Sequence, residues 1–162
     1  MRIGILSDSH GRVKITARAV STLLERGAEL LIHLGDFETE QVIDELVGHE
    51  CRIVFGNCDW DIKGLTRYAQ AMDVRVDHPL GRLEVDDKIV AFTHGHIGRI
   101  MDQALEDGVD YLLHGHSHEL RDECIGSTRI INPGALFRAS RYTVAILDPG
   151  LDALEFIDIP PP

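Results

Sequence analysis

Residues 3–10 are Ile3-Gly4-Ile5-Leu6-Ser7-Asp8-Ser9-His10, so a short apolar run passes directly into an acidic residue and a histidine. Short runs of this kind, partly β-branched or aromatic and bounded by glycine, predict buried strands. Four further apolar runs also lead to side chains that can bind a metal: 30–34 to Asp36, 53–55 to Asn57, 89–93 to His94, and 111–113 to His116 and His118. Ligands of open α/β sheets bind beyond the carboxyl ends of the strands, so these five runs together predict one site.

Length and composition predict one ordinary globular domain that spans residues 1–162. A chain of 162 residues with 44% hydrophobic residues is long enough to bury a sizeable core. The apolar run after Arg2 is too short for the core of a signal peptide, and no stretch is long enough to span a membrane. Cys51, Cys58 and Cys124 are odd in number and form no Cys-x-x-Cys pair, which favours reduced thiols in the cytoplasm.

The net charge of −11, with nine histidines counted as neutral, argues against general nucleic-acid binding because an acidic surface repels a long polyanion. A small phosphate ester at a metal site is a different case. Two divalent cations would outweigh the charges of Asp8 and Asp36, so a local pocket could still attract an anion.

Periodicity predicts alternating strands and helices in the first half of the chain and hairpins in the second. Helical stripes of apolar residues occur over 13–24, 42–47 and 97–105, with a weaker one over 65–72, and Gly27, Gly48 and Gly108 follow three of them. Strand pairs flank the turns at 86–87, 126–127 and 148–150. The tail from Ile159 ends in consecutive prolines that cannot continue a ladder, so we expect it to fray. The pattern predicts an α/β fold with two packed β-sheets and helices outside.

The types of ligand narrow the choice of metal. The set contains two carboxylates, one amide oxygen and four imidazoles, which suits Mn, Fe, Co, Ni or Zn better than Ca or Mg alone. Seven ligands exceed what one tetrahedral ion takes, whereas two ions that share a bridging carboxylate would use them all. Asp8 and His10 are two residues apart, as are His116 and His118, so in an extended chain each pair would project to the same side.

The ordered motifs resemble those of a known family. They are Asp8-Ser9-His10, Gly35-Asp36, Gly56-Asn57, His94-Gly95-His96 and Gly115-His116-Ser117-His118, with Asn132-Pro133-Gly134 beyond them. This set is similar to that of the calcineurin-like metallophosphoesterases, and the short length and the Gly-Asn-Cys-Asp form resemble their small YfcE-type phosphodiesterase branch. The resemblance implies a four-layer αββα sandwich with two mixed sheets.

The resemblance also implies a role for each ligand. Asp8, His10 and His118 would hold one divalent metal ion, Asn57, His94 and His116 would hold a second, and Asp36 would bridge the two. Manganese is the first expectation, with Fe, Zn, Ni or Co as alternatives. A hydroxide between the ions would attack phosphorus, which makes Asp36, Asn57 and His94 the central catalytic candidates.

The chain departs from the family pattern at Cys58. Many members have a histidine there that protonates the leaving group, and a thiol of ordinary pKa is a poor acid for that purpose. Diesters and esters with acidic leaving groups need less proton help, so we expect a small or exposed phosphodiester as substrate. Asp59, often the partner of the missing histidine, is expected to lack its usual role.

Other residues near the motifs permit more than one interpretation. His33 and His114 are expected to be core or orienting histidines, and His49 and His78 to be surface residues. Candidates for contact with the substrate or for orienting a ligand are His96, Cys58, Asp59, Arg12 and Arg138. Trp60 either forms a wall of the pocket or packs in the core.

Two alternative functions stay open at this point. A phosphomonoesterase of the same family would use the same ligands, although Cys58 argues against it. A protein-binding scaffold that resembles the retromer subunit of this fold would need no catalysis, but ligand-type residues at all seven positions argue for an enzyme. The sequence also leaves homo-oligomer formation open.

Overall fold

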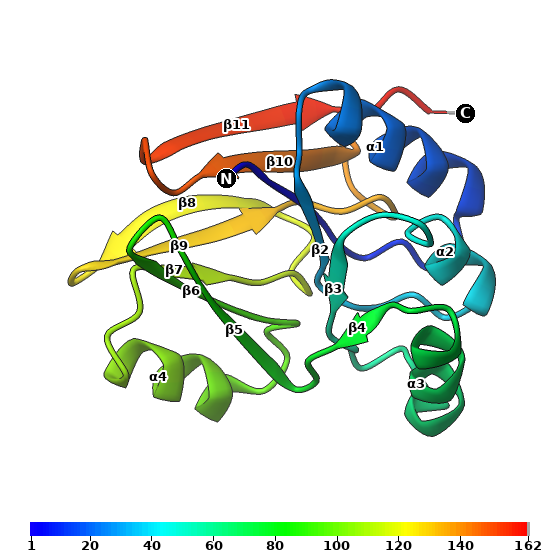
Figure 1. The fold of residues 1–162 in the computed structure, drawn as a ribbon, viewed down its shortest axis with the longest axis horizontal. Coiled ribbons are helices and arrows are strands. Elements are labelled where there is room, and N and C mark those ends of the chain that lie inside the picture. Colours follow the sequence, from blue (N-terminus) through cyan, green and yellow to red (C-terminus); the bar gives the residue numbers. More distant parts are fainter. Residues whose placement is uncertain (162) are drawn as a thin grey trace.

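The computed structural model describes residues 1–161 as two β-sheets packed face to face with helices on both outer sides (Figure 1). In spatial order, the first sheet contains β11 (Ala153–Asp158), β10 (Thr143–Asp148), β1 (Ile3–Leu6), β2 (Leu30–His33), β3 (Cys51–Ile53) and β4 (Arg75–Val76). The second contains β5 (Leu80–Val85), β6 (Lys88–Thr93), β7 (Tyr111–Leu113), β9 (Thr128–Pro133) and β8 (Leu120–Ile125). Both sheets are mixed: the first is parallel from β1 to β4 and antiparallel at β10 and β11, and the second has a parallel centre between two antiparallel edge strands. The predicted fold class is confirmed.

Three layers of apolar side chains hold this sandwich together. The central layer lies between the sheets, and it includes Ile5 and Ile32 from the first sheet and Phe92 and Leu113 from the second. The outer face of the first sheet is covered by α1 (Val13–Glu25), α2 (Glu40–Asp44) and α3 (Ile62–Ala71). The outer face of the second sheet is covered by α4 (Gly98–Glu106). Strands with apolar contacts on both faces explain why the sequence shows continuous apolar runs at β1, β2 and β7.

The helices and hairpins follow the predicted pattern closely. Gly27 and Gly108 have positive φ angles two residues beyond α1 and α4, as expected for residues that end helices. Gly48 also has a positive φ angle, but it lies four residues beyond α2, which ends earlier than the apolar stripe predicts. The turn between β5 and β6 is formed by Asp86 and Asp87, with φ angles of 52° and 61°. Asp tolerates the left-handed region better than most residues, so this turn forms although it contains no glycine.

Two details of the fold differ from the sequence prediction. The short strand β4 was not predicted, because a two-residue strand has no detectable alternation. The C-terminal segment is also better anchored than expected: Ile159 is 3% exposed and its N–H donates to the carbonyl of Tyr142 at 2.8 Å. Arg18 donates to the carbonyls of Pro160 and Pro161. The expected fraying of residues 159–161 is therefore wrong, because contacts with distant residues replace the missing strand pairing.

None of the helices in residues 1–161 is long and apolar enough to cross a membrane. The fold places the carboxyl ends of β1, β2 and β3 beside those of β6 and β7. The turns that follow these strands are the ones that carry the predicted metal ligands.

Candidate metal centre

The backbone itself ties the ligand-bearing turns to one another. The N–H of Asp8 donates to the carbonyl of Gly35 at 3.0 Å, and the N–H of His10 donates to the carbonyl of Asp36 at 2.9 Å. In the second sheet, the N–H of Gly115 donates to the carbonyl of His94 at 2.9 Å. The turns after neighbouring strands therefore have a fixed spacing before any side chain is considered.

The side chains of the predicted ligands converge from these turns. His118 Nε2 is 3.3 Å from Asp8 Oδ1, and His10 Nε2 is 3.5 Å from Asp36 Oδ2. His94 Nε2 is 3.4 Å from the same Asp36 oxygen, so Asp36 lies between histidines of the two sheets. Ligand atoms that lie within 4.8 Å of one another form three groups: Asp8, His10 and His118; His10, Asp36 and Cys58; and Asp8, Asp36 and His94.

Asn57 and His116 complete the cluster. The side-chain oxygen of Asn57 is 3.2 Å from His94 Nε2. The His116 ring centroid is 5.2 Å from that of His94, and the His116 N–H donates to Asp8 Oδ2 at 3.0 Å. All seven residues predicted as ligands are thus close neighbours in the structure.

The cluster contains polar atoms that protein groups do not satisfy. Within residues 1–161, Asp8 Oδ1 and His10 Nε2 are buried and have no hydrogen-bond partner. Buried polar atoms without partners are costly and call for an explanation such as a bound ion. Carboxylate oxygens and imidazole nitrogens that face one another are the donors that divalent transition metals prefer, so the residues present fit such ions.

The backbone at the ligands is unusual and corrects one prediction. The φ angles are 55° at Asp8, 42° at His10, 59° at Asp36, 70° at His116 and 59° at His118. All five lie in the left-handed region, which costs free energy for residues other than glycine and is concentrated at functional sites. The expectation that the backbone is extended at the Asp8/His10 pair and at the His116/His118 pair is therefore wrong. Their side chains converge because the backbone turns sharply, not because it alternates.

Two glycines in the motifs are required for close approach. A Cβ atom on Gly56 would collide with the Asp36 carboxylate, and one on Gly115 would collide with Ser7 and Asp8. Since both contacts involve buried side chains at the centre of the cluster, larger residues at these positions would push the carboxylates out of place.

Asp36 and His94 form the most enclosed pair of the cluster. His94 Nδ1–H donates to the carbonyl of Leu34 at 2.7 Å, which directs Nε2 toward Asp36. Asp36 Oδ1 accepts from the N–H of Cys58 at 2.8 Å. Burial tends to raise the pKa of Asp36, but His94 and the Cys58 N–H outweigh it and hold the pKa well below its ordinary value. Asp36 is therefore ionised at neutral pH, as a metal ligand must be.

His10 is oriented by a residue that the sequence analysis missed. Its Nδ1 is 2.7 Å from Glu38 Oε1, so Nε2 faces the cluster. A carboxylate behind a histidine is a common way to orient a metal ligand. The sequence offered one sign of this role: Glu38 follows Asp36 by two residues, on a turn expected to lie beside His10.

Asp59 has a structural role that the sequence did not predict. It is 3% exposed, and its two oxygens accept hydrogen bonds from the backbone N–H groups of Asp36, Phe37, Glu38 and Gly56, at 2.7–2.9 Å. The carboxylate of Asp59 therefore ties the turn after β2 to the turn that carries Asn57. This role is separate from that of a partner to a histidine at position 58, which this chain replaces with Cys58.

The thiol of Cys58 is no better suited to acid catalysis than the sequence suggested. Burial and the nearby charge of Asp36 raise the pKa of Cys58 to about 11. A group with this pKa holds its proton at neutral pH and releases it with difficulty to a leaving oxygen.

The histidines assigned to the core or to orienting roles occupy such positions. His33 is fully buried, accepts from the Gly35 N–H at its Nδ1 and therefore donates from Nε2 to the Ser9 hydroxyl at 2.8 Å. Burial lowers the pKa of His33 to about 3. His114 is buried and its Nδ1 is 3.0 Å from the carbonyl of Gly115, whereas His49 is exposed as predicted.

His78 was predicted to be a surface residue, and the structure corrects this. Its side chain is half-buried and accepts a hydrogen bond from the Phe55 N–H at 3.2 Å. The contact crosses from the end of β3 to the segment before β5, so sequence spacing gave no sign of it.

Asn132 explains why Asn132-Pro133-Gly134 belongs to the motif set. Its amide nitrogen donates to the carbonyl of Gly115 at 2.9 Å and to the Ser117 hydroxyl at 3.1 Å. Asn132 therefore holds the turn that carries His116 and His118.

His96 lies beside the cluster rather than in it. Its ring centroid is 5.2 Å from that of His94 and 6.1 Å from that of His116. Burial and the neighbouring imidazoles lower the pKa of His96. His96 stays a candidate for contact with the substrate or for orienting a ligand.

Arg12 and Arg138 meet at a residue that the sequence analysis missed. Their guanidinium carbons lie 4.8 Å and 5.0 Å from the centroid of the Phe137 ring, which is itself 4.8 Å from the His10 ring. Two cationic side chains are thus held at one rim of the cluster. Trp60 is 90% exposed, so the alternative in which it packs in the core is wrong.

Comparisons with known proteins agree with this geometry. Residues 1–150 match the model of the calcineurin-like phosphoesterase superfamily domain. Phosphodiesterase MJ0936 of Methanocaldococcus jannaschii is 30% identical over 156 residues, which cover 91% of this chain and 93% of the relative. Phosphodiesterase YfcE of Escherichia coli strain K12 is 24% identical, with 84% of this chain and 79% of the relative covered.

A solved structure described as a novel archaeal phosphodiesterase superposes with a TM-score of 0.89 at 28% identity, and the match covers 98% of this chain and 100% of that chain. The match extends over both sheets and therefore includes every turn of the ligand cluster. On the strength of the motif order, the converging ligands and the match over residues 1–150, this chain belongs to the calcineurin-like phosphoesterase superfamily.

Proposed function

We propose that this protein is a dinuclear metal-dependent phosphodiesterase that hydrolyses a small or exposed phosphodiester. The observation that carries the proposal is the position of Asp36, whose carboxylate lies 3.5 Å from His10 Nε2 and 3.4 Å from His94 Nε2. One carboxylate between histidines of two sheets suits a bridge between two ions. The similarity to proteins named phosphodiesterases supports the choice of substrate class.

The proposed ligands divide into two sets around Asp36. Asp8, His10 and His118 would hold one ion, and Asn57, His94 and His116 would hold the other. Manganese is proposed first, with Fe, Zn, Ni and Co as alternatives, because imidazole-rich sites favour these metals over magnesium. Bound divalent ions supply an activated water nucleophile and neutralise charge on the phosphate.

The residues around the ligands have supporting tasks. The Leu34 carbonyl and the Glu38 carboxylate contact the Nδ1 atoms of His94 and His10, so that the Nε2 atom of each ring faces the cluster, where it could bind a metal. Arg12 and Arg138 supply positive charge at the rim where an anionic ester would enter, although the whole chain carries −11.

Preference for a diester is proposed on the basis of Cys58. A monoester with a poor leaving group needs a proton donor, and a thiol with a pKa of about 11 is a weak one. The scaffold alternative is less well supported, because it gives no reason for seven ligand-type side chains around buried atoms without partners.

We further propose that residues 1–162 form a single calcineurin-like phosphoesterase domain, because one apolar layer joins the two sheets. A cytoplasmic location is proposed on the basis of the free thiols of Cys51, Cys58 and Cys124.

The test combines metal analysis with hydrolysis assays. Protein purified without chelators is expected to contain about two transition-metal ions per chain and to hydrolyse bis(p-nitrophenyl) phosphate faster than an alkyl phosphomonoester. Chelation should remove the activity, and Mn²⁺ should restore it better than Mg²⁺. A Cys124→Ser variant, altered at an exposed thiol on β8, serves as the control.

Three results would contradict the proposal. A single ion per chain would argue against the dinuclear site, and full activity of the chelated protein in Mg²⁺ alone would argue against the metal assignment. A wild-type preference for the alkyl monoester would instead favour the phosphomonoesterase.

A further inference from the structure

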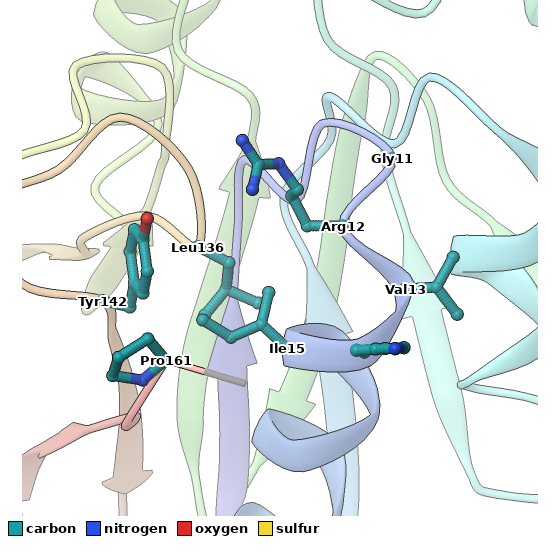
Figure 2. Close-up of a pocket in the computed structure, with 8 residues that line it drawn as sticks. Gly11, Arg12, Val13, Ile15, Leu136, Tyr142 and Pro161 are labelled. Atoms are coloured by element: carbon teal, nitrogen blue, oxygen red, sulfur yellow. The ribbon is translucent and has the colours of Figure 1, made fainter.

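A cavity of about 440 Å³ adjoins the ligand cluster at the first turn of α1 (Figure 2). Its volume is within the range of small-molecule sites. The residues that line it include the cationic Arg12 and Lys14 and four largely apolar residues, Ile15, Leu136, Tyr142 and Pro161. We refer to this cavity as the α1 pocket.

The α1 pocket lies near the ligand cluster, and Arg12 belongs to the segment between them. This residue follows His10 by two positions and lines the pocket. Its guanidinium carbon is also 4.8 Å from the centroid of the Phe137 ring, which contacts the His10 ring. A molecule bound beside His10 would therefore lie close to Arg12, one of the residues that line the pocket.

The lining combines an apolar floor with a cationic rim. Ile15 and Leu136 are 3% and 1% exposed, whereas Arg12 and Lys14 are exposed. Figure 2 shows Tyr142 and Pro161 together on one side, with the Arg12 guanidinium above Ile15 and Leu136. An apolar floor beside an aromatic ring suits a flat apolar group, and the cations suit an anion attached to that group.

The wall formed by Tyr142 and Pro161 is held by distant contacts. Arg18 of α1 donates to the carbonyls of Pro160 and Pro161 at 2.8 Å and 2.7 Å. The N–H of Ile159 donates to the carbonyl of Tyr142 at 2.8 Å. The pocket is thus already formed in the protein and does not require a loop to close.

We propose that the α1 pocket binds the organic substituent of the phosphodiester that does not leave, and that it prefers an aromatic substituent. This inference rests on the proposed function. A monoester has only one substituent, which must be the leaving group, so it would gain nothing from the α1 pocket. The pocket therefore supplies a preference for diesters that is independent of Cys58.

The kinetic test uses two diesters with the same leaving group, methyl p-nitrophenyl phosphate and phenyl p-nitrophenyl phosphate. The wild type is expected to have a kcat/KM about tenfold higher for the phenyl ester, mainly through a lower KM, as burial of one ring predicts. Tyr142→Ala should remove this preference and leave the methyl ester within about twofold of the wild type. Tyr142→Phe should retain the preference because it keeps the ring.

A matched control is Leu151→Ala, since Leu151 is 78% exposed on the turn between β10 and β11. It should leave both diesters unchanged. If the active wild type shows no phenyl preference, or if Tyr142→Ala lowers both diesters equally, the proposal is overturned and the proposed function still stands.

A binding measurement separates this inference from the proposed function. Chelated protein with labelled methyl groups is titrated with phenylphosphonate and with methylphosphonate, and NMR signals are followed. Larger shifts at Ile15 and Leu136 with the phenyl compound would support the α1 pocket even if no diester were hydrolysed. Equal shifts with the two compounds at Ile15 and Leu136, or no shifts at these residues, would overturn it.

Discussion

The turn after β1, which carries Asp8 and His10, and the turn after β2, which carries Asp36, lie side by side but are held in different ways. The first is anchored by a neutral histidine, His33, through the Ser9 hydroxyl. The second is anchored by the carboxylate of Asp59, which accepts four backbone N–H bonds. One turn thus depends on a group that must stay uncharged, and the other depends on an acceptor that works best when charged.

This difference indicates that the two turns have different roles in the site. Asp36 is the residue that both proposed ions would share, and the turn that positions it is secured by three backbone N–H bonds to the buried carboxylate of Asp59. A fourth bond, from the Gly56 N–H, ties the same carboxylate to the turn that carries Asn57. The turn with Asp8 and His10 adjoins the Arg12 rim and the α1 pocket, where an incoming ester needs access. Substitutions on the Asp36 side should therefore have the larger effects on hydrolysis.

The largest effect is expected for Asp36→Ala compared with His96→Ala. Loss of the proposed bridge disturbs both ions and should lower kcat/KM for a diester by about a thousandfold or more. His96 lies beside the cluster, so its loss should cost much less. Steady-state assays at matched metal occupancy test this order, and equal residual rates would contradict it.

The second largest effect is expected for Asp59→Asn, which removes the charge of the carboxylate that anchors the Asp36 turn. An amide nitrogen in place of one oxygen would face backbone N–H groups, so Asp36 and Asn57 should lose their spacing. We expect metal affinity or activity to fall by about 10- to 100-fold, as for other residues that orient ligands. Asp61→Asn is the matched control, because Asp61 is exposed and caps α3 through the Gly64 N–H. Equal metal titration curves for the two variants would show that Asp59 does not position the ligands.

The neutral anchor predicts a dependence of stability on pH. The pKa of His33 is about 3 in the folded protein, against 6.5 for an ordinary histidine. Below pH 6.5 the unfolded chain therefore binds more protons than the folded protein does. The stability that depends on a neutral His33 is fully present above pH 6.5 and is lost as the pH falls toward 3. In the wild type, the free energy of unfolding should therefore rise with pH between pH 4 and pH 6. His33→Gln should reduce the slope of this free energy against pH by up to about 1.4 kcal/mol per pH unit.

Denaturant unfolding at several pH values measures this slope. His49→Gln is the control, since His49 is exposed and should leave the slope unchanged. A slope that is the same in wild type and His33→Gln would mean that His33 is not the titrating anchor.

The smallest effect is expected for Cys58→His, which changes the Asp36 side without moving its anchor. An imidazole can donate a proton near neutral pH, so hydrolysis of an alkyl monoester should rise by about fivefold, below the full contribution of a well-placed acid. A nitrophenyl diester needs little proton help and should change less. Rates for both esters at equal metal content, with Cys58→Ser as the control, test this. An equal change for both esters would show that residue 58 does not set the substrate class.

Most secondary-structure elements could be predicted because their patterns are local. The apolar runs at β1, β2 and β7 and the glycine after α1 depend on a few adjacent residues. The strand β4 and the anchored segment at 159–161 could not be predicted in this way, because their stabilising contacts are with residues far away in the sequence.

The sequence by itself determined the family-like motif order and the seven candidate ligands, since ligand chemistry depends on residue type and strand ends determine where side chains gather. Only the tertiary structure decided how the ligands are held: the left-handed backbone at Asp8 and His10, the four bonds of Asp59, and the Arg12–Phe137 rim beside the α1 pocket. The physical reason is distance along the chain. Asp59 bonds to residues more than twenty positions earlier, and Arg12 meets a ring 125 positions later, where no sequence periodicity extends.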